Sequence, residues 1–201
     1  MSWKLITATG AALGVVGLVS LVRRPAAAKS GRRRIALIGD SYAVGLGPEL
    51  AKQLGSDFQY EGHSGISSGA WANRIASQCS QSRGAGFDHG QGCGDWLAGF
   101  QPDIVLVSLG VNDGIAPNPA NYQAIVRALQ GIGAQVVWIE PPADVDVPTE
   151  RVRQIIQSLG VTTVPATATA LRAEANGAHV HPASYSPWSA EIAQATESAY
   201  A

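Results

Sequence analysis

The sequence predicts an α/β fold in which helices cover both faces of a parallel β-sheet. Short continuous apolar runs recur along the chain, and this pattern is typical of strands that are buried in a parallel sheet. Longer stretches that favour helices separate these runs. Because each strand, crossover helix and following parallel strand form a right-handed unit, the alternation predicts a three-layer α/β/α sandwich.

Five segments have the pattern of buried strands. The first covers residues 34–39, and a second continuous apolar run covers residues 103–109 and is ended by Gly110. The other expected strands are shorter and cover residues 58–62, 135–139 and 161–164.

Five segments between and after these strands are expected to be helical. The first covers residues 44–54 and contains Pro48, which a helix tolerates only in its first turn. The stretch 79–95 is rich in Gly, Ser and Gln and is expected to be a loop. The remaining expected helices cover residues 70–80, 121–129, 148–159 and 187–199.

An apolar run without charges, residues 5–22, precedes the expected domain. Basic residues bound the run on both sides, and its length is near the lower limit for a helix that spans a bilayer. We expect a membrane anchor or signal segment with a basic linker over residues 1–34, and one globular domain over residues 35–201. An uncleaved anchor, a signal cleaved after small residues, and a buried helix of the domain are the open alternatives. The protein is expected at a membrane or exported to the cell envelope.

Basic residues concentrate in this N-terminal part. Half of the 14 Lys and Arg residues lie in residues 1–34, so the remaining domain is acidic. An acidic domain argues against nucleic acid as a partner, because phosphate contacts need a basic surface. A neutral substrate is favoured.

The chain has two cysteines, Cys79 and Cys93, which bracket the stretch that is rich in Gly, Ser and Gln. They either close this stretch as a disulfide or remain two buried thiols, and the sequence leaves both alternatives open. Two cysteines provide few ligands, so no metal site is expected.

Four short motifs follow one another along the chain. In order, they are Gly39-Asp40-Ser41, Gly65, Gly110-Val111-Asn112-Asp113, and His179 with Pro182 and Tyr185 behind it. This order resembles the SGNH hydrolases, also called the GDSL esterase and lipase family, over residues 33–200. The family is named for a Ser, a Gly, an Asn and a His. The resemblance implies a flavodoxin-like strand order for the sheet.

Ser41 is the expected nucleophile, because it stands where a predicted strand ends and a helix begins. A serine hydroxyl needs a base within hydrogen-bond distance, and the resemblance assigns this role to His179. His181, two residues later on the same expected loop, is the alternative base. The resemblance assigns the oxyanion hole to the N–H groups of Ser41 and Gly65 and to the amide of Asn112. These three residues lie just past predicted strand ends, so we expect them on one rim of the sheet.

The last motif departs from the family at one position. Three residues before His179, where the family has an aspartate that orients the imidazole, this chain has Asn176. We expect the Asn176 carbonyl to accept the ring N–H without an aspartate's charge, and Glu174 is an alternative partner for the ring. Asp40 and Asp113 are expected to brace loops rather than to act in catalysis.

The resemblance implies a serine-dependent carboxylic ester hydrolase that forms an acyl-enzyme without a metal or organic cofactor. The chain lacks a large lid insertion, which favours removal of short acyl groups, such as acetyl, from an envelope glycan. Two alternatives remain at this stage. One is an O-acyltransferase of the same fold, and the other is a catalytically degenerate protein that binds a glycan or anchors a complex.

Overall fold

The computed structural model describes residues 33–75, 77–78, 84–86, 92–143, 145–166 and 179–200. They belong to one compact unit, which spans Arg32–Ala201. The predicted N-terminal anchor lies outside the described residues. Within the described ranges, no helix combines the length and the apolar character needed to cross a membrane.

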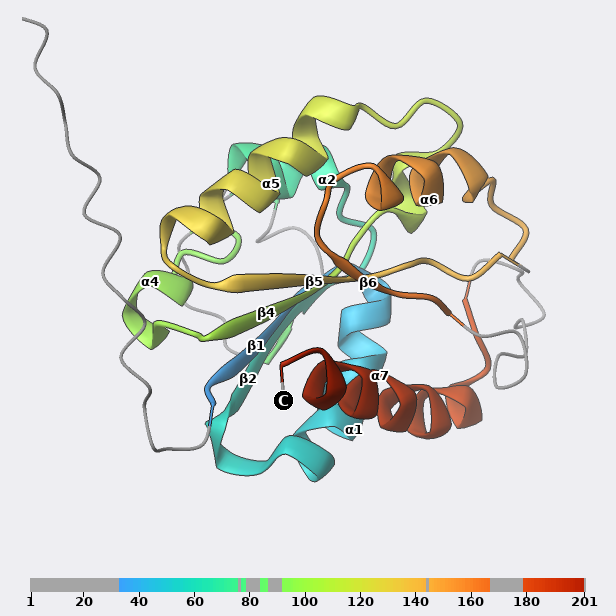
Figure 1. The fold of residues 1–201 in the computed structure, drawn as a ribbon. Helices are drawn as coiled ribbons and strands as arrows, with labels where there is room; N and C mark the ends of the chain where they lie inside the picture. Colours follow the sequence, from blue (N-terminus) through green and yellow to red (C-terminus); the bar gives the residue numbers. More distant parts are fainter. Residues whose placement is uncertain are drawn as a thin grey trace, which may run out of the picture. The chain divides into compact units, whose positions relative to one another are not determined.

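Five parallel strands form the centre of the domain (Figure 1). Their order across the sheet is β2 (Phe58–His63), β1 (Ile35–Gly39), β4 (Ile104–Ser108), β5 (Gln135–Ile139) and β6 (Thr162–Val164). The predicted parallel α/β sheet is therefore confirmed. Counted among the parallel strands alone, this arrangement has the flavodoxin-like order 2-1-3-4-5.

A sixth strand, β3 (Gly84–Gly86), pairs antiparallel with β2 at the edge of the sheet. The prediction that residues 79–95 form only a loop is wrong at this point. The strand has the sequence Gly-Ala-Gly, which lacks the β-branched and aromatic residues that favour strands. Its position depends on backbone pairing with β2, a contact that the local sequence does not reveal.

Helices cover both faces of the sheet (Figure 1). On one face lie α1 (Ser41–Leu54) and α7 (Tyr185–Ala199). The other face is covered by α2 (Ser68–Asn73), α4 (Leu97–Phe100), α5 (Pro119–Gly131) and α6 (Glu150–Gln157). Successive strand residues point to opposite faces, so Leu37 and Leu106 belong to the first core and Ile38 and Val107 to the second.

Two helix boundaries differ from the prediction by more than two residues, each for a local reason. Helix α1 begins at Ser41 rather than residue 44, because the Asp40 carboxylate accepts the N–H of Tyr42 at 3.0 Å and caps the helix. Pro48 therefore lies in the helix interior and not in its first turn. Helix α2 ends at Asn73, well before residue 80, because Arg74 adopts a left-handed backbone with φ 51°.

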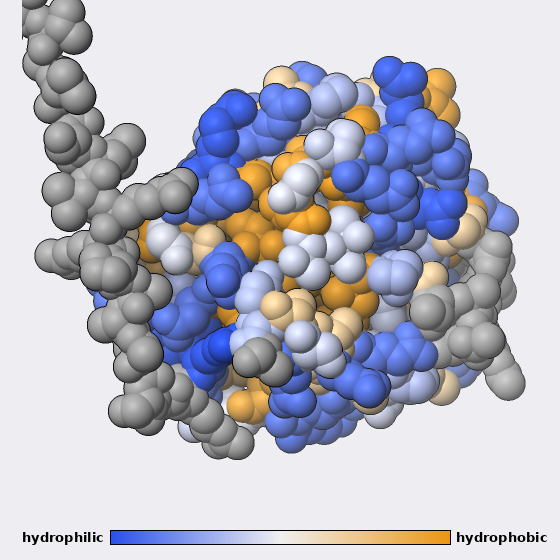
Figure 2. All heavy atoms as spheres, viewed as in Figure 1, coloured by the Kyte–Doolittle hydropathy of each residue, from blue (hydrophilic) through white to orange (hydrophobic). Residues whose placement is uncertain are grey.

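Apolar side chains reach the surface on the face that carries α4 and α5 (Figure 2). A pocket of about 80 Å³ lies there, and its lining includes Trp71, Leu97 and Ile125. The helices of this layer therefore leave part of the underlying core accessible.

Candidate active site

The sheet brings three of the predicted site residues to one rim. Ser41 follows β1 and opens α1, Gly65 lies in the turn after β2, and Asn112 lies in the short helix η2 (Val111–Asp113) after β4. Strand β1 pairs with both β2 and β4, so the carboxyl ends of the three strands are neighbours. This is the edge where ligands bind in sheets of this kind.

His179 approaches this rim from the opposite end of the sequence. Its Nε2 lies 2.8 Å from the Oγ of Ser41. The ring of Tyr42 packs edge-on against the imidazole, with the centroids 6.1 Å apart. The hydroxyl and the imidazole thus have the hydrogen-bond geometry of a nucleophile and its base.

The orientation of the imidazole depends on its second nitrogen. For Nε2 to accept the Ser41 proton, Nδ1 must carry the ring hydrogen. The two predicted partners of that N–H, Asn176 and Glu174, lie outside the described residues.

His181 has a different environment. Its exposed ring accepts the N–H of Ala183 through Nδ1 at 3.1 Å and caps the short helix η3 (Pro182–Ser184). Of the two histidines, the structure thus places His179 against Ser41 and engages His181 in a cap.

The turn after β2 presents Gly65. The N–H of Ile66 donates to the carbonyl of His63 at 3.2 Å, and Gly65 has φ +79°, as the third residue of a type II turn requires. A Cβ on Gly65 would meet no atom of the described residues within 4 Å, so among these residues the positive φ rather than lack of space favours glycine. The amide of Asn112 donates to the carbonyl of Ile66 at 3.0 Å and fixes the far side of this turn.

Asp40 is fully buried directly before Ser41. Its Oδ1 accepts the N–H of Tyr42, and its Oδ2 has no hydrogen-bond partner among the described residues. Burial raises the pKa of Asp40 from 3.8 to about 7, and the charge of Asp113 acts in the same direction. The N–H groups of Tyr42, Gly110 and Val111 oppose this rise in pKa. A carboxyl that titrates near neutral pH thus lies next to Ser41.

Asp113 links the loop after β4 to two helices. Its Oδ1 accepts the N–H of Ser68 at 2.9 Å, and its Oδ2 accepts the hydroxyl of Tyr122. Burial and the charge of Asp113 raise the pKa of Tyr122, so the phenol stays protonated and donates. Asp113 therefore holds the loop after β4, as the sequence predicts, whereas Asp40 caps α1.

The sequence motifs do not single out Glu61 and His63, two buried ionisable residues at the end of β2. The sequence did contain a signal for this site: Glu61 lies inside the predicted strand 58–62, and charged side chains rarely occur inside buried strands. Nearby, Cys93 is disulfide-bonded, which agrees with the first of the two alternatives for the cysteines. Cys79, the other cysteine of the chain, lies outside the described residues.

The described fold is similar to several solved hydrolase structures. A GDSL-like lipase from Bacteroides thetaiotaomicron is 18% identical, with a TM-score of 0.58 over 84% of this chain and 89% of that one. Esterase EstA from Pseudoalteromonas sp. is 16% identical, with a TM-score of 0.57 over 82% of this chain and 97% of that one. The C-terminal catalytic domain of the Streptococcus pneumoniae peptidoglycan O-acetyltransferase A is 19% identical, with a TM-score of 0.51 over 83% and 94%. At these identities the likeness shows the fold alone.

Sequence comparison identifies the family directly. No curated protein sequence matches the chain. The family model described as GDSL-like Lipase/Acylhydrolase matches residues 37–199, which include all four motifs and the described sheet except the first two residues of β1. The chain therefore belongs to the GDSL-like lipase/acylhydrolase family and is a hydrolase of the esterase type.

Proposed function

We propose that the protein cleaves carboxylic esters through a serine acyl-enzyme. The observation that carries this proposal is the 2.8 Å contact between Ser41 Oγ and His179 Nε2. In the first step, Oγ attacks the ester carbonyl carbon while Nε2 takes the hydroxyl proton. His179 then gives this proton to the leaving alcohol, and the acyl group stays on Ser41.

The second step releases the acyl group. Water attacks the acyl carbonyl while His179 Nε2 takes one of its protons, and the same proton returns to Ser41 Oγ when the acid leaves. Neither step needs a metal or an organic cofactor.

Three donors would hold the oxyanion that forms in each step. The N–H of Ser41 belongs to the first turn of α1, where backbone N–H groups have no partner within the helix. The N–H of Gly65 comes from the fixed turn after β2. The amide of Asn112 has two N–H groups, and the bond to Ile66 uses one of them. Donors of this kind typically contribute several kcal/mol to the stability of the transition state.

Asn176 is our candidate for supporting Nδ1 of His179. An asparagine carbonyl can accept the ring N–H, but it does not stabilise the imidazolium with a charge. Replacing the corresponding aspartate of a serine protease lowers kcat by about 10⁴. We therefore expect slow turnover unless another carboxylate, such as that of Glu174, reaches the ring.

For the substrate, we propose short acyl groups, such as acetyl, on an envelope glycan. The absence of a large lid insertion, the acidic domain and the apolar N-terminal run support a neutral substrate at the cell envelope or membrane. The structural similarity to a peptidoglycan O-acetyltransferase domain suggests the related alternative, in which a sugar hydroxyl replaces water in the second step. The contact between Ser41 and His179 argues against a degenerate binding protein.

The full-length protein should be tested with p-nitrophenyl acetate, butyrate and octanoate. We expect hydrolysis that is fastest for acetate and is lost in Ser41→Ala and His179→Ala. His181→Ala is the matched control and should keep the parent's kcat, because His181 caps η3 instead of contacting Ser41. A fluorophosphonate should label Ser41, as located by peptide mass spectrometry. A folded parent that neither hydrolyses an ester nor reacts with the fluorophosphonate would contradict the proposal. Faster acyl transfer to an added glycan than to water would favour the acyltransferase.

A further inference from the structure

Glu61 and His63 form a buried ionisable pair that the proposed reaction does not use. Their side chains are 8% and 6% exposed, respectively. Alternate residues of a strand point to the same face, and here that face is the one covered by α2. A buried carboxylate is costly unless hydrogen bonds compensate for its lost hydration, so the contacts of this pair indicate its role.

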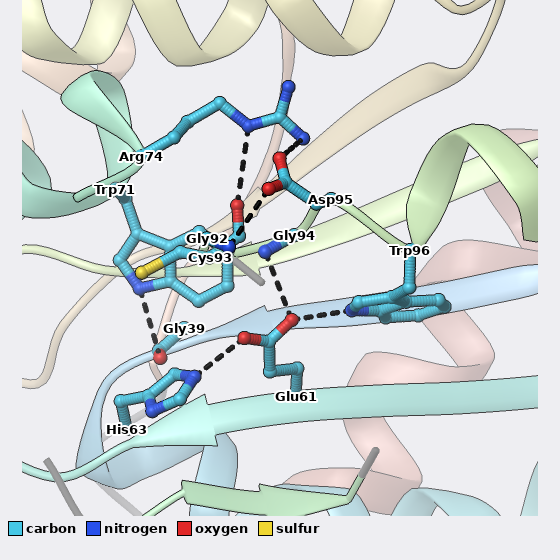
Figure 3. Close-up of polar contacts among 10 residues, drawn as sticks. All are labelled: Gly39, Glu61, His63, Trp71, Arg74, Gly92, Cys93, Gly94, Asp95 and Trp96. Atoms are coloured by element: carbon cyan, nitrogen blue, oxygen red, sulfur yellow. Dashed lines mark hydrogen bonds and ion pairs between the residues drawn. The ribbon is translucent and has the colours of Figure 1, made fainter. Parts of the chain in front are cut away.

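Glu61 is held by groups from two sides (Figure 3). Its Oε1 lies 2.6 Å from Nε2 of His63. Its Oε2 accepts the N–H of Gly94 at 3.0 Å and the indole N–H of Trp96. Both of these groups can only donate, so Oε2 acts as a double acceptor. Residues 92–96 are called the donor loop below.

The donor loop is anchored to the domain at several points. Cys93 is 1% exposed and disulfide-bonded. Asp95 forms an ion pair with Arg74 at 2.5 Å, between side chains that are partly exposed. Gly94 has φ +69°, and a Cβ on it would lie 2.9 Å from the ring of Trp71. The donors are therefore presented from a loop that is cross-linked and closely packed.

His63 connects this pair to the catalytic rim. Its carbonyl closes the turn that presents Gly65, by accepting the N–H of Ile66 at 3.2 Å. Its ring packs edge-on against Trp71, with the centroids 5.9 Å apart. The indole N–H of Trp71 donates to the carbonyl of Gly39 at 3.2 Å, two residues before the nucleophile (Figure 3). A continuous set of contacts thus runs from the donor loop to both sides of the oxyanion hole.

We propose that Glu61 is a positioning residue that couples the disulfide-bonded donor loop to the turn presenting Gly65. This inference deepens the proposed ester hydrolysis and rests on it. With the disulfide intact, the donor loop fixes Glu61, Glu61 fixes His63, and the Gly65 N–H stays directed at the oxyanion. Reduction by a dithiol breaks the S–S bond, and each sulfur gains one electron and one proton while the reagent becomes a disulfide. The donor loop then loses an anchor, and activity falls.

The direct test compares Glu61→Gln with Glu140→Gln in the full-length protein. Glu140 is a matched control, because it is also buried, at 5% exposure, beyond the end of β5, and it contacts the amide of Gln157 instead of the oxyanion turn. We expect Glu61→Gln to lower kcat by roughly 10- to 100-fold with little change in KM, since small misplacement of an oxyanion donor has effects of this size. Glu140→Gln should keep both values. Equal kcat values in the two variants would overturn the proposal.

The His63 ring gives a second measurement that does not depend on turnover. In Glu61→Gln, the oxygen of the glutamine amide can still accept the N–H groups of Gly94 and Trp96. The NH₂ group of the amide then faces Nε2 of His63, so this nitrogen has to accept a hydrogen bond instead of donating one. The ring must move its hydrogen to Nδ1, which has no hydrogen-bond partner among the described residues. The ¹⁵N shifts of His63 should report this change of tautomer in Glu61→Gln, and reduction of the parent should also perturb them. Unchanged shifts in both experiments would contradict the coupling.

The dependence on the disulfide is tested by combining the two perturbations. Dithiothreitol should lower kcat of the parent, and it should have little further effect on Glu61→Gln, because both changes interrupt the same contacts. If reduction and Glu61→Gln lower kcat by factors that multiply, the disulfide and Glu61 act independently, and the proposal is overturned. Fluorophosphonate labelling of the oxidised parent separates the two hypotheses. An unlabelled Ser41 would refute the proposed hydrolysis, whereas a labelled, active and reduction-insensitive enzyme would refute only the coupling.

Discussion

Asparagine in place of Asp40 should change how the stability of the protein depends on pH. Burial raises the pKa of Asp40 from 3.8 to about 7 in the folded state, while the unfolded chain keeps the ordinary value. Between these two values, the folded protein holds a proton that the unfolded chain has released. Stability therefore falls as the pH rises through this window and becomes constant above it. The variant has no carboxyl at this position and lacks this contribution.

The size of the effect follows from the two pKa values. They differ by about 3, and each whole pKa value corresponds to 1.36 kcal/mol, so the parent should lose about 4 kcal/mol relative to the variant between pH 4 and pH 7. Asparagine can still accept the N–H of Tyr42 and is a favourable N-cap residue. The start of α1 should therefore remain intact in the variant.

The assay is urea unfolding of the full-length proteins, followed by tryptophan fluorescence at whole pH values from 4 to 8. The quantity to compare is the difference in unfolding free energy between Asp40→Asn and the parent at each pH. Other titrating groups are common to both proteins and largely cancel in this difference. A difference that stays constant from pH 4 to 7 would refute a protonated Asp40 in the folded state near neutrality.

Three further substitutions test other parts of the structure. Tyr122→Phe removes the hydroxyl that donates to Asp113, and it should lower the unfolding free energy by about 1–3 kcal/mol, as measured by urea unfolding, because an acceptor loses its partner. Gly65→Ala places a Cβ at φ +79° and should lower the unfolding free energy by roughly 1–2 kcal/mol. The variant should also have a lower kcat and a nearly unchanged KM, and an unchanged kcat would argue against an oxyanion role for this turn. Glu150→Gln removes a carboxylate whose pKa is lowered by its hydrogen bond to Arg153. The parent's small stability advantage should be complete above the ordinary Glu pKa and should be lost as the pH falls from there through the lowered pKa of the folded state. Thermal unfolding from pH 3 to 6 would detect the opposite trend if that reasoning were wrong.

Parts of the fold follow from the local sequence because their signals are local. Buried parallel strands need continuous apolar segments, and the predicted strand 135–139 coincides with β5 (Gln135–Ile139). Residues that directly follow such strands must lie at their carboxyl ends. The common rim of Ser41, Gly65 and Asn112 was therefore predictable before any contact was known.

Other features depend on contacts between segments that are distant in the sequence. The motif favours His179 over His181 as the base, but the distance between either imidazole and Ser41 is defined only in the folded chain, where His179 contacts Ser41 and His181 caps η3. Strand β3 forms through its pairing with β2. Pro48 lies in the interior of α1, between Leu46 and Leu50, whose side chains are fully buried. Tertiary packing overrides the local preference in these cases.

The sequence by itself determined the α/β class, the order of the four motifs and the family of this protein, because apolar periodicity and motif order are properties of the chain. Only the tertiary structure showed that His179 contacts Ser41, that Asp40 is buried with no partner for Oδ2 among the described residues, and that Glu61 joins β2 to the donor loop. Burial and hydrogen-bond partners arise from residues far apart in the sequence, so they become defined only when the strands and loops are assembled.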